Sequence, residues 1–210
     1  MSPLLDDVIG VAHNRMILSR RVTVLSKWFA ELMPPQARVL DVGCGDGALS
    51  ARLGALRSDL AIEGVDVLAR EKSQIPVTLF DGTRLPFDDE SFDAVMFSDV
   101  LHHTADPTVL QREARRVARR HVLIKDHFVA GFAANARLRA MDWVGNARFG
   151  VSLPYNYWRE AEWLAVWSSL GLRLERIVRE LGLYAEPLNR VTGAGLHFVA
   201  RLEKADMRPE

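Results

Sequence analysis

Apolar residues follow two different spacings along the chain, and these spacings predict a regular order of helices and strands. From Arg15 to Met33 they recur every three or four positions, which is typical of a helix with one buried face. Short apolar runs bounded by turn residues predict buried strands at 38–43, 60–67, 76–80, 92–100 and 121–126. Helical spacing returns between strands, at 48–56 and 107–119. This alternation predicts a parallel sheet with helices on both faces.

The last third of the chain departs from the alternation. Two helices are expected at about 129–143 and 158–169, on either side of an irregular, aromatic-rich stretch. Two more strand-like runs follow at 173–180 and 195–203. Earlier, Pro107 is expected to begin its helix, with Asp106 as the N-terminal cap. We therefore expect a single α/β domain over residues 1–210.

Composition and charge narrow the possible partners. The 27 Lys and Arg residues balance 27 Asp and Glu residues, so the net charge offers no long-range attraction for nucleic acid or an anionic membrane. The arginines between 112 and 120 are expected to form a solvated helix face. No apolar stretch reaches the roughly 18 to 20 residues that cross a bilayer. Cys44 is the only cysteine, and the start lacks a secretory pattern, so we expect a soluble cytoplasmic protein, monomeric or homodimeric.

A glycine-rich turn, VLDVGCGDG at 39–47, follows the first predicted strand. Gly43, Gly45 and Gly47 remove side chains where the chain turns into a helix, which is expected to bring bare backbone amides and the positive helix N-terminus to a ligand. In open parallel sheets, ligands bind at this edge. A tight turn without a ligand is the alternative interpretation.

Two classes of adenosine cofactor fit this turn. Gly43, Gly45 and Ala48 match a dinucleotide fingerprint, and Asp66, 23 residues after Gly43, is placed to bind a ribose in either class. Asp41, just before the turn, disfavours a pyrophosphate and favours a cationic ligand. The sequence also lacks a Tyr-x-x-x-Lys pair for hydride chemistry. An NAD-linked oxidoreductase is therefore the weaker alternative.

Five segments in this order and spacing carry a family resemblance: VLDVGCGDG, GVD at 64–66, DGTRLPFDDESFDAVMFSDVLHH at 81–103, QREARRVAR and HVLIKD. Over about residues 36–127 the chain resembles the class I S-adenosylmethionine-dependent methyltransferases, in particular the small-molecule branch similar to the type 11 group. The resemblance implies a Rossmann-like, doubly wound sheet of seven strands, mostly parallel with the last strand antiparallel. It also implies S-adenosylmethionine as cofactor and S-adenosylhomocysteine as product.

The resemblance assigns cofactor-binding roles by motif. Gly43 and Gly45 would approach the methionine part, Asp41 would help to hold its amino group, Asp66 would bind the ribose hydroxyls, and Asp81 would face the adenine amino group. The same pocket would include Cys44 as a small packing residue, together with Val67, Gly82, Phe97 and Ser98.

One feature departs from the family pattern. Only 15 residues separate Asp66 from Asp81, which is too few for the usual helix between the second and third strands. We expect a short loop there and a more open adenine side.

Candidate acid–base residues follow the fourth and fifth strands, at the expected ligand edge: His102, His103, Asp126 and His127. Such a base is needed only if the methyl acceptor is protonated. Packing against the cofactor is the alternative for the two adjacent histidines, and a strand-end ion pair with Lys125 is the alternative for Asp126. His13 and His197 are expected to be peripheral, and no metal site is expected.

The aromatic-rich stretch is expected to line an acceptor pocket through Trp143, Tyr155 and Tyr157, with core packing as the alternative. The domain then has four parts: a helical region and possible lid or frayed end at 1–33, a cofactor-binding core at 36–127, an acceptor-side helical insertion at 128–172 and a terminal strand pair at 173–204. The expected function is methyl transfer (EC 2.1.1) to an oxygen, nitrogen or carbon of a small hydrophobic metabolite. A non-catalytic cofactor-binding regulatory module is the other alternative.

Overall fold

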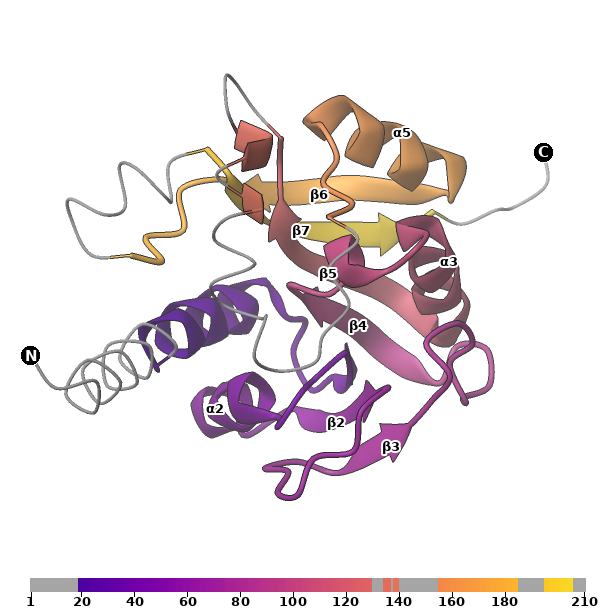
Figure 1. The fold of residues 1–210 in the computed structure, drawn as a ribbon. Helices are drawn as coiled ribbons and strands as arrows, with labels where there is room; N and C mark the ends of the chain where they lie inside the picture. Colours follow the sequence, from indigo (N-terminus) through magenta and orange to yellow (C-terminus); the bar gives the residue numbers. More distant parts are fainter. Residues whose placement is uncertain (1–18, 130–133, 137, 140–154, 185–194, 206–210) are drawn as a thin grey trace, which may run out of the picture.

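The computed structural model of the protein describes residues 19–129, 134–136, 138–139, 155–184 and 195–205, and a seven-stranded sheet forms its centre (Figure 1). The strands are β1 (Arg38–Val42), β2 (Ala61–Asp66), β3 (Val77–Leu79), β4 (Phe92–Ser98), β5 (Ala118–His127), β6 (Leu172–Val178) and β7 (His197–Lys204). Their spatial order is β3-β2-β1-β4-β5-β7-β6. The first five are parallel, and β7 runs antiparallel to both β5 and β6. The mostly parallel sheet with an antiparallel last strand is therefore confirmed.

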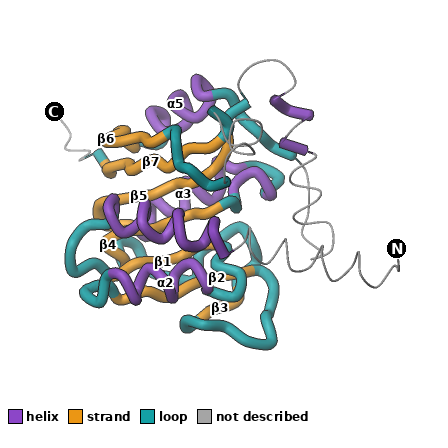
Figure 2. The backbone as a smooth tube through the Cα atoms, turned by 90° about the vertical axis from the view of Figure 1, so that its left-hand side faces the viewer, coloured by secondary structure: helices purple, strands orange, loops and turns teal. Residues whose placement is uncertain are grey.

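Helices cover both faces of this sheet (Figures 1 and 2). The helix at 19–32 and α2 (Ala48–Leu56) lie on one face, and α3 (Pro107–Val117) and α5 (Glu160–Ser169) lie on the other. A short 3-10 helix, η1 (Leu101–His103), follows β4. This is the doubly wound arrangement that the sequence predicts.

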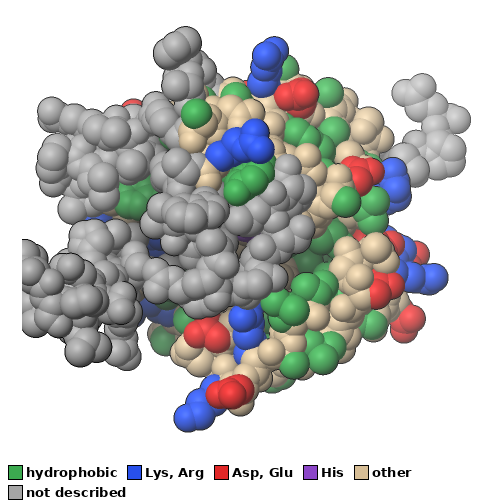
Figure 3. All heavy atoms as spheres, viewed as in Figure 1, with side chains coloured by type: hydrophobic (Ala, Val, Ile, Leu, Met, Phe, Trp, Pro, Cys, Tyr) green, Lys and Arg blue, Asp and Glu red, His purple; other side chains and the backbone are tan. Residues whose placement is uncertain are grey.

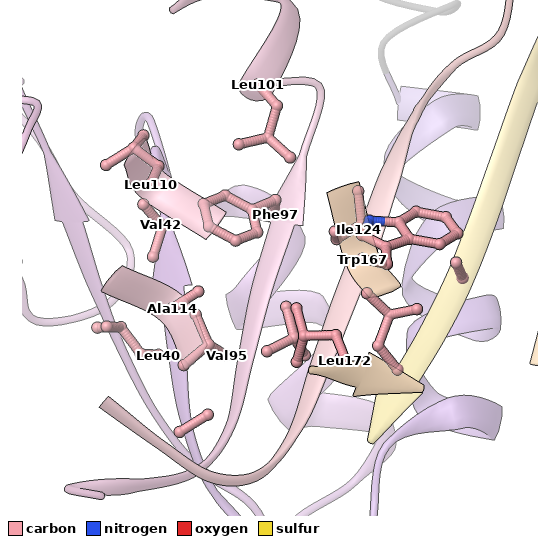
Figure 4. Close-up of a cluster of buried hydrophobic side chains, with 14 of the residues drawn as sticks. Leu40, Val42, Val95, Phe97, Leu101, Leu110, Ala114, Ile124, Trp167 and Leu172 are labelled. Carbon is pink, nitrogen blue, oxygen red and sulfur yellow. The ribbon is translucent and has the colours of Figure 1, made fainter. Parts of the chain in front are cut away.

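The central strands are buried on both sides, because successive side chains point to opposite faces of the sheet. Leu40, Val95 and Ile124 pack with Trp167 of α5 in the larger buried cluster (Figure 4). Their neighbours along the strands belong to a second cluster with the helix at 19–32, which contributes Leu25, Phe29 and Leu32. Each of these large side chains stabilises the fold by about 1.5–3 kcal/mol through burial.

Several element boundaries differ from the sequence prediction. The helix expected at 107–119 ends at Val117, and residues 118–120 already belong to β5. The strand expected to reach residue 100 ends at Ser98, because Asp99 turns the chain with a φ of +59°. The predicted cap is present, since Asp106 accepts a hydrogen bond from the Thr108 amide. Residues 67–76 contain no helix, as their spacing predicts.

Some expectations lie outside the described residues: the possible lid at 1–18, most of the helix expected at 129–143, and Trp143. Within the described ranges, none of the helices is both long and apolar enough to cross a bilayer. The described side chains on the face shown in Figure 3 mix acidic and basic groups, in keeping with the balanced charge.

Candidate functional site

The glycine turn leaves the sheet beside the end of β4, at the edge where the carboxyl ends of the parallel strands meet. Val42 at the end of β1 is in register with Phe97 on β4 and with Val65 on β2. The residues that follow these positions are therefore brought together at one edge.

Two of the three glycines make room for the protein's own side chains. A Cβ at Gly43 would lie 2.6 Å from Cγ2 of Val100, and a Cβ at Gly47 would lie 2.6 Å from Cγ1 of Ile75. All three glycines have positive φ angles, from +60° to +74°. Only Gly45 faces open space, with no heavy atom of the described residues within 4 Å of a Cβ built there. Of the three glycines, Gly45 is therefore the one at which the described residues leave room for a ligand.

The backbone amides of the turn already donate hydrogen bonds within the protein, whereas the sequence analysis expected them to be free for a ligand. The Gly43 and Cys44 amides both donate to the Val65 carbonyl, at 2.8 and 3.2 Å. The Gly45 amide donates to Oδ2 of Asp66 at 2.8 Å, and the Gly47 amide donates to the Cys44 carbonyl. The turn closes on itself because β2 supplies acceptors beside it. These four N–H groups are already engaged and are poorly suited to cradle a phosphate.

Asp66 lies at the end of β2 with both carboxylate oxygens oriented by the backbone. Its Oδ2 accepts from Gly45, and its Oδ1 accepts from the Leu68 amide at 2.9 Å. The residue is 6% exposed, and each oxygen retains a second lone pair. A pair of ribose hydroxyls fits this fixed carboxylate beside the open face of Gly45.

Asp41 lies beneath the turn. It is 2% exposed, and its Oδ2 accepts a hydrogen bond from Ser50 Oγ at 2.7 Å. Burial raises the pKa of Asp41 to about 7, against the lowering effect of the Ser50 hydroxyl. A cation beside Gly45 would favour the ionised form of this carboxyl, and an anion would oppose it. Because Asp41 is buried and hydrogen-bonded to Ser50, it would act on a ligand through its charge and not through a direct contact.

The loops after β2 and β3 touch each other on the expected adenine side. Val67 is 54% exposed, and its Cγ1 lies 3.2 Å from a Cβ built at Gly82. Asp81 accepts hydrogen bonds at Oδ1 from the Thr83 and Arg84 amides, which lower its pKa. Residues 67–76 contain no helix, and Val67 lies exposed at the surface there.

Three other residues assigned to the pocket face in different directions. Phe97 is fully buried in the core with Val42 and Leu101 (Figure 4), so its side chain does not reach the exposed edge. Ser98, one residue later, is half-buried at the end of β4. The Cys44 side chain packs against Gly64, where a Cβ would lie 2.5 Å from Sγ, and burial raises its thiol pKa to about 12. Cys44 is therefore a packing residue and a poor nucleophile.

Three of the four acid–base candidates, His102, Asp126 and His127, form a buried group at the ends of β4 and β5, and the half-buried His103 lies beside His102. Nδ1 of His102 lies 2.6 Å from Oδ1 of Asp126, and the two side chains are 1% and 0% exposed. The same oxygen accepts from the His127 amide at 2.9 Å and lies 3.1 Å from His127 Nδ1. Burial opposes ionisation of Asp126, but His102 and His127 hold its pKa below the usual range. Burial also lowers the pKa of His127 to about 4, so His127 is neutral at neutral pH.

Lys125 does not pair with Asp126, because neighbouring strand residues point to opposite faces. Its fully buried ammonium instead contacts Oδ1 of Asp99, and Arg21 of the helix at 19–32 donates to Oδ2 of Asp99 at 2.7 Å. These two cations hold the pKa of Asp99 well below its usual value despite burial. Burial lowers the pKa of Lys125 to about 8, against the raising effect of Asp99.

His197, expected to be peripheral, lies inside this group. It is 1% exposed, and its Nδ1 lies 3.4 Å from the Lys125 ammonium. Burial, with a contribution from Lys125, lowers its pKa well below the ordinary value. The sequence expectation was wrong because the antiparallel pairing that places His197 opposite His127 is not visible in the sequence.

Asp99, His102 and His127 each offer a potential metal-ligand atom, and these atoms lie within 4.8 Å of one another. The charges around them oppose a divalent cation. Asp99 already pairs with two cations, Lys125 and Arg21, and a metal would have to compete with a buried ammonium for the same oxygen.

The acceptor-side aromatic residues lie over the histidines. The Tyr157 ring stacks on His102, with centroids 5.3 Å apart, and its hydroxyl donates to the Leu138 carbonyl. Tyr155 has a φ of +58°, which is unusual for a residue with a side chain. Asn156 ties this segment to η1, since its amide donates to the His102 carbonyl and its Nδ2 donates to Thr104 and Ala105.

Sequence reasoning missed Asp99, Arg21 and Val100. One signal was available: Asp99 is a carboxylate at a strand end, as Asp66 and Asp81 are, but the strand was expected to continue through it. Nothing in the sequence indicated that Arg21 would reach it, because 78 residues separate the two.

Comparisons with known proteins agree with this geometry. Residues 40–124 match a family model described as a methyltransferase domain. In solved structures, the fold matches a putative methyltransferase in complex with the Trm112 methyltransferase activator from Haloferax volcanii, with a TM-score of 0.71, 16% identity and 97% of both chains covered. Residues 40–124 are thus similar to this methyltransferase family, and the fold of the chain is one that solved methyltransferase structures share.

The fold also resembles that of magnesium protoporphyrin IX methyltransferase from Synechocystis with bound S-adenosylhomocysteine (TM-score 0.58, 16% identity, 98% of this chain and 89% of that chain). Among curated relatives, a demethylmenaquinone methyltransferase from Beutenbergia cavernae is 34% identical over 55% of this chain and 48% of its own length. A ubiquinone biosynthesis O-methyltransferase from Xanthomonas axonopodis is 45% identical over 40% of this chain and 39% of its own length. The chain thus matches about half or less of these relatives' lengths.

Proposed function

We propose that this protein transfers a methyl group from S-adenosylmethionine to a small, hydrophobic metabolite. The observation that carries the proposal is the closed glycine turn. Its engaged amides disfavour a pyrophosphate, while the open face of Gly45, the oriented Asp66 carboxylate and the buried Asp41 carboxyl suit a cationic adenosyl compound. The same features argue against the NAD-linked alternative.

Bound S-adenosylmethionine supplies an activated methyl group on a sulfonium, so the protein's task is positioning. Asp66 would hold the ribose at the end of β2, and Asp81 would face the adenine. Asp41 would favour the positive charge from beneath the turn. Alignment of the acceptor with the methyl group can lower the barrier by about 7–11 kcal/mol when it is ideal.

We assign the role of general base to His102, oriented by Asp126. The ionised Asp126 carboxylate accepts from Nδ1 of His102 and so fixes the orientation of the imidazole ring that would take the proton. Bound S-adenosylmethionine would supply the methyl group, and His102 would take the proton that the acceptor hydroxyl loses. Such a base suits a hydroxyl acceptor. His103 and His127 adjoin this pair, and Tyr155 and Tyr157 would form a wall for a flat acceptor.

The relatives agree with a small acceptor, since their names refer to demethylmenaquinone and to ubiquinone biosynthesis. The single cysteine and the absence of an internal disulfide suit a reducing compartment such as the cytoplasm. The alternative of a non-catalytic binding module predicts cofactor binding without turnover. The buried His102–Asp126 pair favours an enzyme, because a binding module has no need for it.

Calorimetric titration with S-adenosylmethionine and S-adenosylhomocysteine tests the cofactor. Wild-type protein should bind both, and Asp66→Ala should weaken binding by about 1.5–3 kcal/mol, the scale of hydrogen bonds that involve a charged group. Exposed Asp88 provides a matched Asp88→Ala control that should bind normally. An unchanged dissociation constant for Asp66→Ala would refute the ribose assignment, and no binding by the wild type would refute the proposed function.

A further inference from the structure

A cavity of about 590 Å³ lies at the edge of the sheet opposite the glycine turn, between α3, the turn before β4 and the end of β7 (Figure 1). At this edge β4 and β5 begin and the antiparallel β7 ends. The volume is within the range of small-molecule sites. The lining consists of charged side chains, and its four cations are Arg112, Arg115 and Arg116 of α3 and Lys204 of β7.

Two of these cations are neutralised by the three carboxylates of the lining. Arg116 donates to Glu113 at 2.6 Å and to Asp89 at 2.8 Å. The Lys204 ammonium donates to Glu90 at 2.7 Å. Every carboxylate that lines the cavity is therefore already paired with Arg116 or Lys204.

Arg112 and Arg115 are left without such a partner. No ion pair joins either of them to a carboxylate in the part of the chain that the structure describes. Asp106 acts on Arg112 through space, but it accepts its hydrogen bonds from Thr108. Nε of Arg115 is buried and has no hydrogen-bond partner among the described residues. A buried N–H group without an acceptor is costly, so this one is suited to a ligand that supplies an acceptor.

The helix brings the two unpaired guanidinium groups to the same place. Arg112 and Arg115 are three residues apart on α3, so their side chains are neighbours, and like charges at this spacing repel each other. The negative C-terminal end of α3 favours Arg115, which lies in the last turn. Arg112 lies before that turn and gains little from it. An anion between the two side chains would remove their repulsion.

A phosphate group has the charge and the geometry for this position. A phosphate monoester carries almost two negative charges at neutral pH and three strong acceptor oxygens, whereas a carboxylate carries one charge and two oxygens. Two guanidinium groups match the phosphate in charge, and each can donate two parallel hydrogen bonds to it. The cavity is also larger than a phosphate ion, which leaves room for a small organic group.

We propose that Arg112 and Arg115 bind a phosphate group in this cavity, either as inorganic phosphate or as the monoester of a small metabolite. The site is at the opposite edge of the sheet from the glycine turn, so it is separate from the proposed cofactor site. The competing explanation is the one that the sequence suggests, a helix face whose arginines are only solvated.

Calorimetric titration at pH 8 and low ionic strength tests the site, with inorganic phosphate, glycerol 3-phosphate and uncharged glycerol as probes. The wild type should bind at least one of the two phosphates and not glycerol. Arg112→Met, which replaces an exposed side chain, should weaken that binding about 10- to 100-fold, the scale of a lost charge-assisted hydrogen bond. The matched control is Arg52→Met, which removes an exposed arginine from α2 and should bind as the wild type does.

Nuclear magnetic resonance of the arginine Nε–H groups provides a readout that a solvated helix face would not give. The Arg115 signal, assigned as the one that Arg115→Met removes, should shift as phosphate is added to the wild type, because its Nε gains an acceptor. Tighter binding of glycerol 3-phosphate than of inorganic phosphate would identify a monoester as the ligand, and the reverse would identify the free ion. Saturating S-adenosylhomocysteine should leave either affinity unchanged.

Three results would overturn the proposal. If the wild type binds neither phosphate, the arginines are only solvated. If Arg52→Met weakens binding as much as Arg112→Met does, the attraction is general and not a site. If S-adenosylhomocysteine displaces the phosphate, the anion binds at the glycine turn instead.

Discussion

His102 Nδ1 and Asp126 Oδ1 lie 2.6 Å apart, with both side chains almost fully buried. One residue comes from the 3-10 turn after β4 and the other from the end of β5. A buried carboxylate is stable in its charged form only with such partners, and His102 and His127 supply them. The pair is thus strongly fixed in position.

Removal of either member of this pair should slow methyl transfer. We expect His102→Gln and Asp126→Asn to lower kcat about 100- to 10,000-fold, the range of a general base, with cofactor affinity unchanged. The loss should shrink for acceptors with more acidic hydroxyls, which need less help to lose their proton. The control is His121→Gln. His121 lies on β5, as Asp126 does, but toward the other end of the strand. An equal loss with every acceptor would mean that the pair only supports the fold.

The pH dependence of the free energy of unfolding should reveal how much the Asp126 carboxylate contributes to stability. Its pKa is lower in the folded than in the unfolded protein, so its contribution is complete above the unfolded value of about 4 and is lost as the pH falls below it. Asp126→Asn should therefore lower the free energy of unfolding most at neutral pH, by about 3–5 kcal/mol as for a broken buried pair. Urea unfolding between pH 3 and 7 measures this. A pH-independent difference would contradict it.

Asp41 should behave in the opposite way, because burial raises its folded pKa to about 7. Its stability contribution is greatest below the unfolded pKa of about 4 and falls as the pH rises toward 7. Asp41→Asn should stabilise the protein at pH 8 by about 2–4 kcal/mol and have little effect at pH 4, since the amide can still accept from Ser50. The same variant should bind cationic S-adenosylmethionine more weakly, relative to neutral-sulfur S-adenosylhomocysteine. Unfolding curves at both pH values, with Asp88→Asn as an exposed control, test the prediction.

Substitutions of the turn glycines should separate effects on packing from effects on cofactor binding. Gly43→Ala and Gly45→Ala share the cost of a positive φ, roughly 1–2 kcal/mol, but only the former also collides with Val100. Gly43→Ala should therefore lower the melting temperature more. Gly45→Ala should fold and lose cofactor affinity, because its methyl group enters the open space at this position. Thermal unfolding and calorimetry together measure both effects, and an unaltered affinity in Gly45→Ala would place the ligand elsewhere.

The sequence by itself determined the sheet, the glycine turn and the resemblance to a methyltransferase family. Apolar spacing located every strand, because a buried parallel strand must be apolar on both faces, and the short interval between Asp66 and Asp81 excluded a helix there. Strand order alone placed the glycines and Asp66 at one edge, together with His102, His103, Asp126 and His127. Local spacing carries this information because the chain must hydrogen-bond its backbone N–H and C=O groups in helices and strands, and the period of each element shows in the apolar positions.

Only the tertiary structure decided which groups meet. Lys125 and Asp126 are neighbours in sequence, yet their side chains leave opposite faces of the sheet and pair with Asp99 and His102. Arg21 reaches Asp99 across 78 residues. The glycine turn proved to be closed by Val65, Val100 and Ile75, which lie on other segments. Such pairings depend on which strands become neighbours and on how side chains fill the space between them, and no local pattern encodes either.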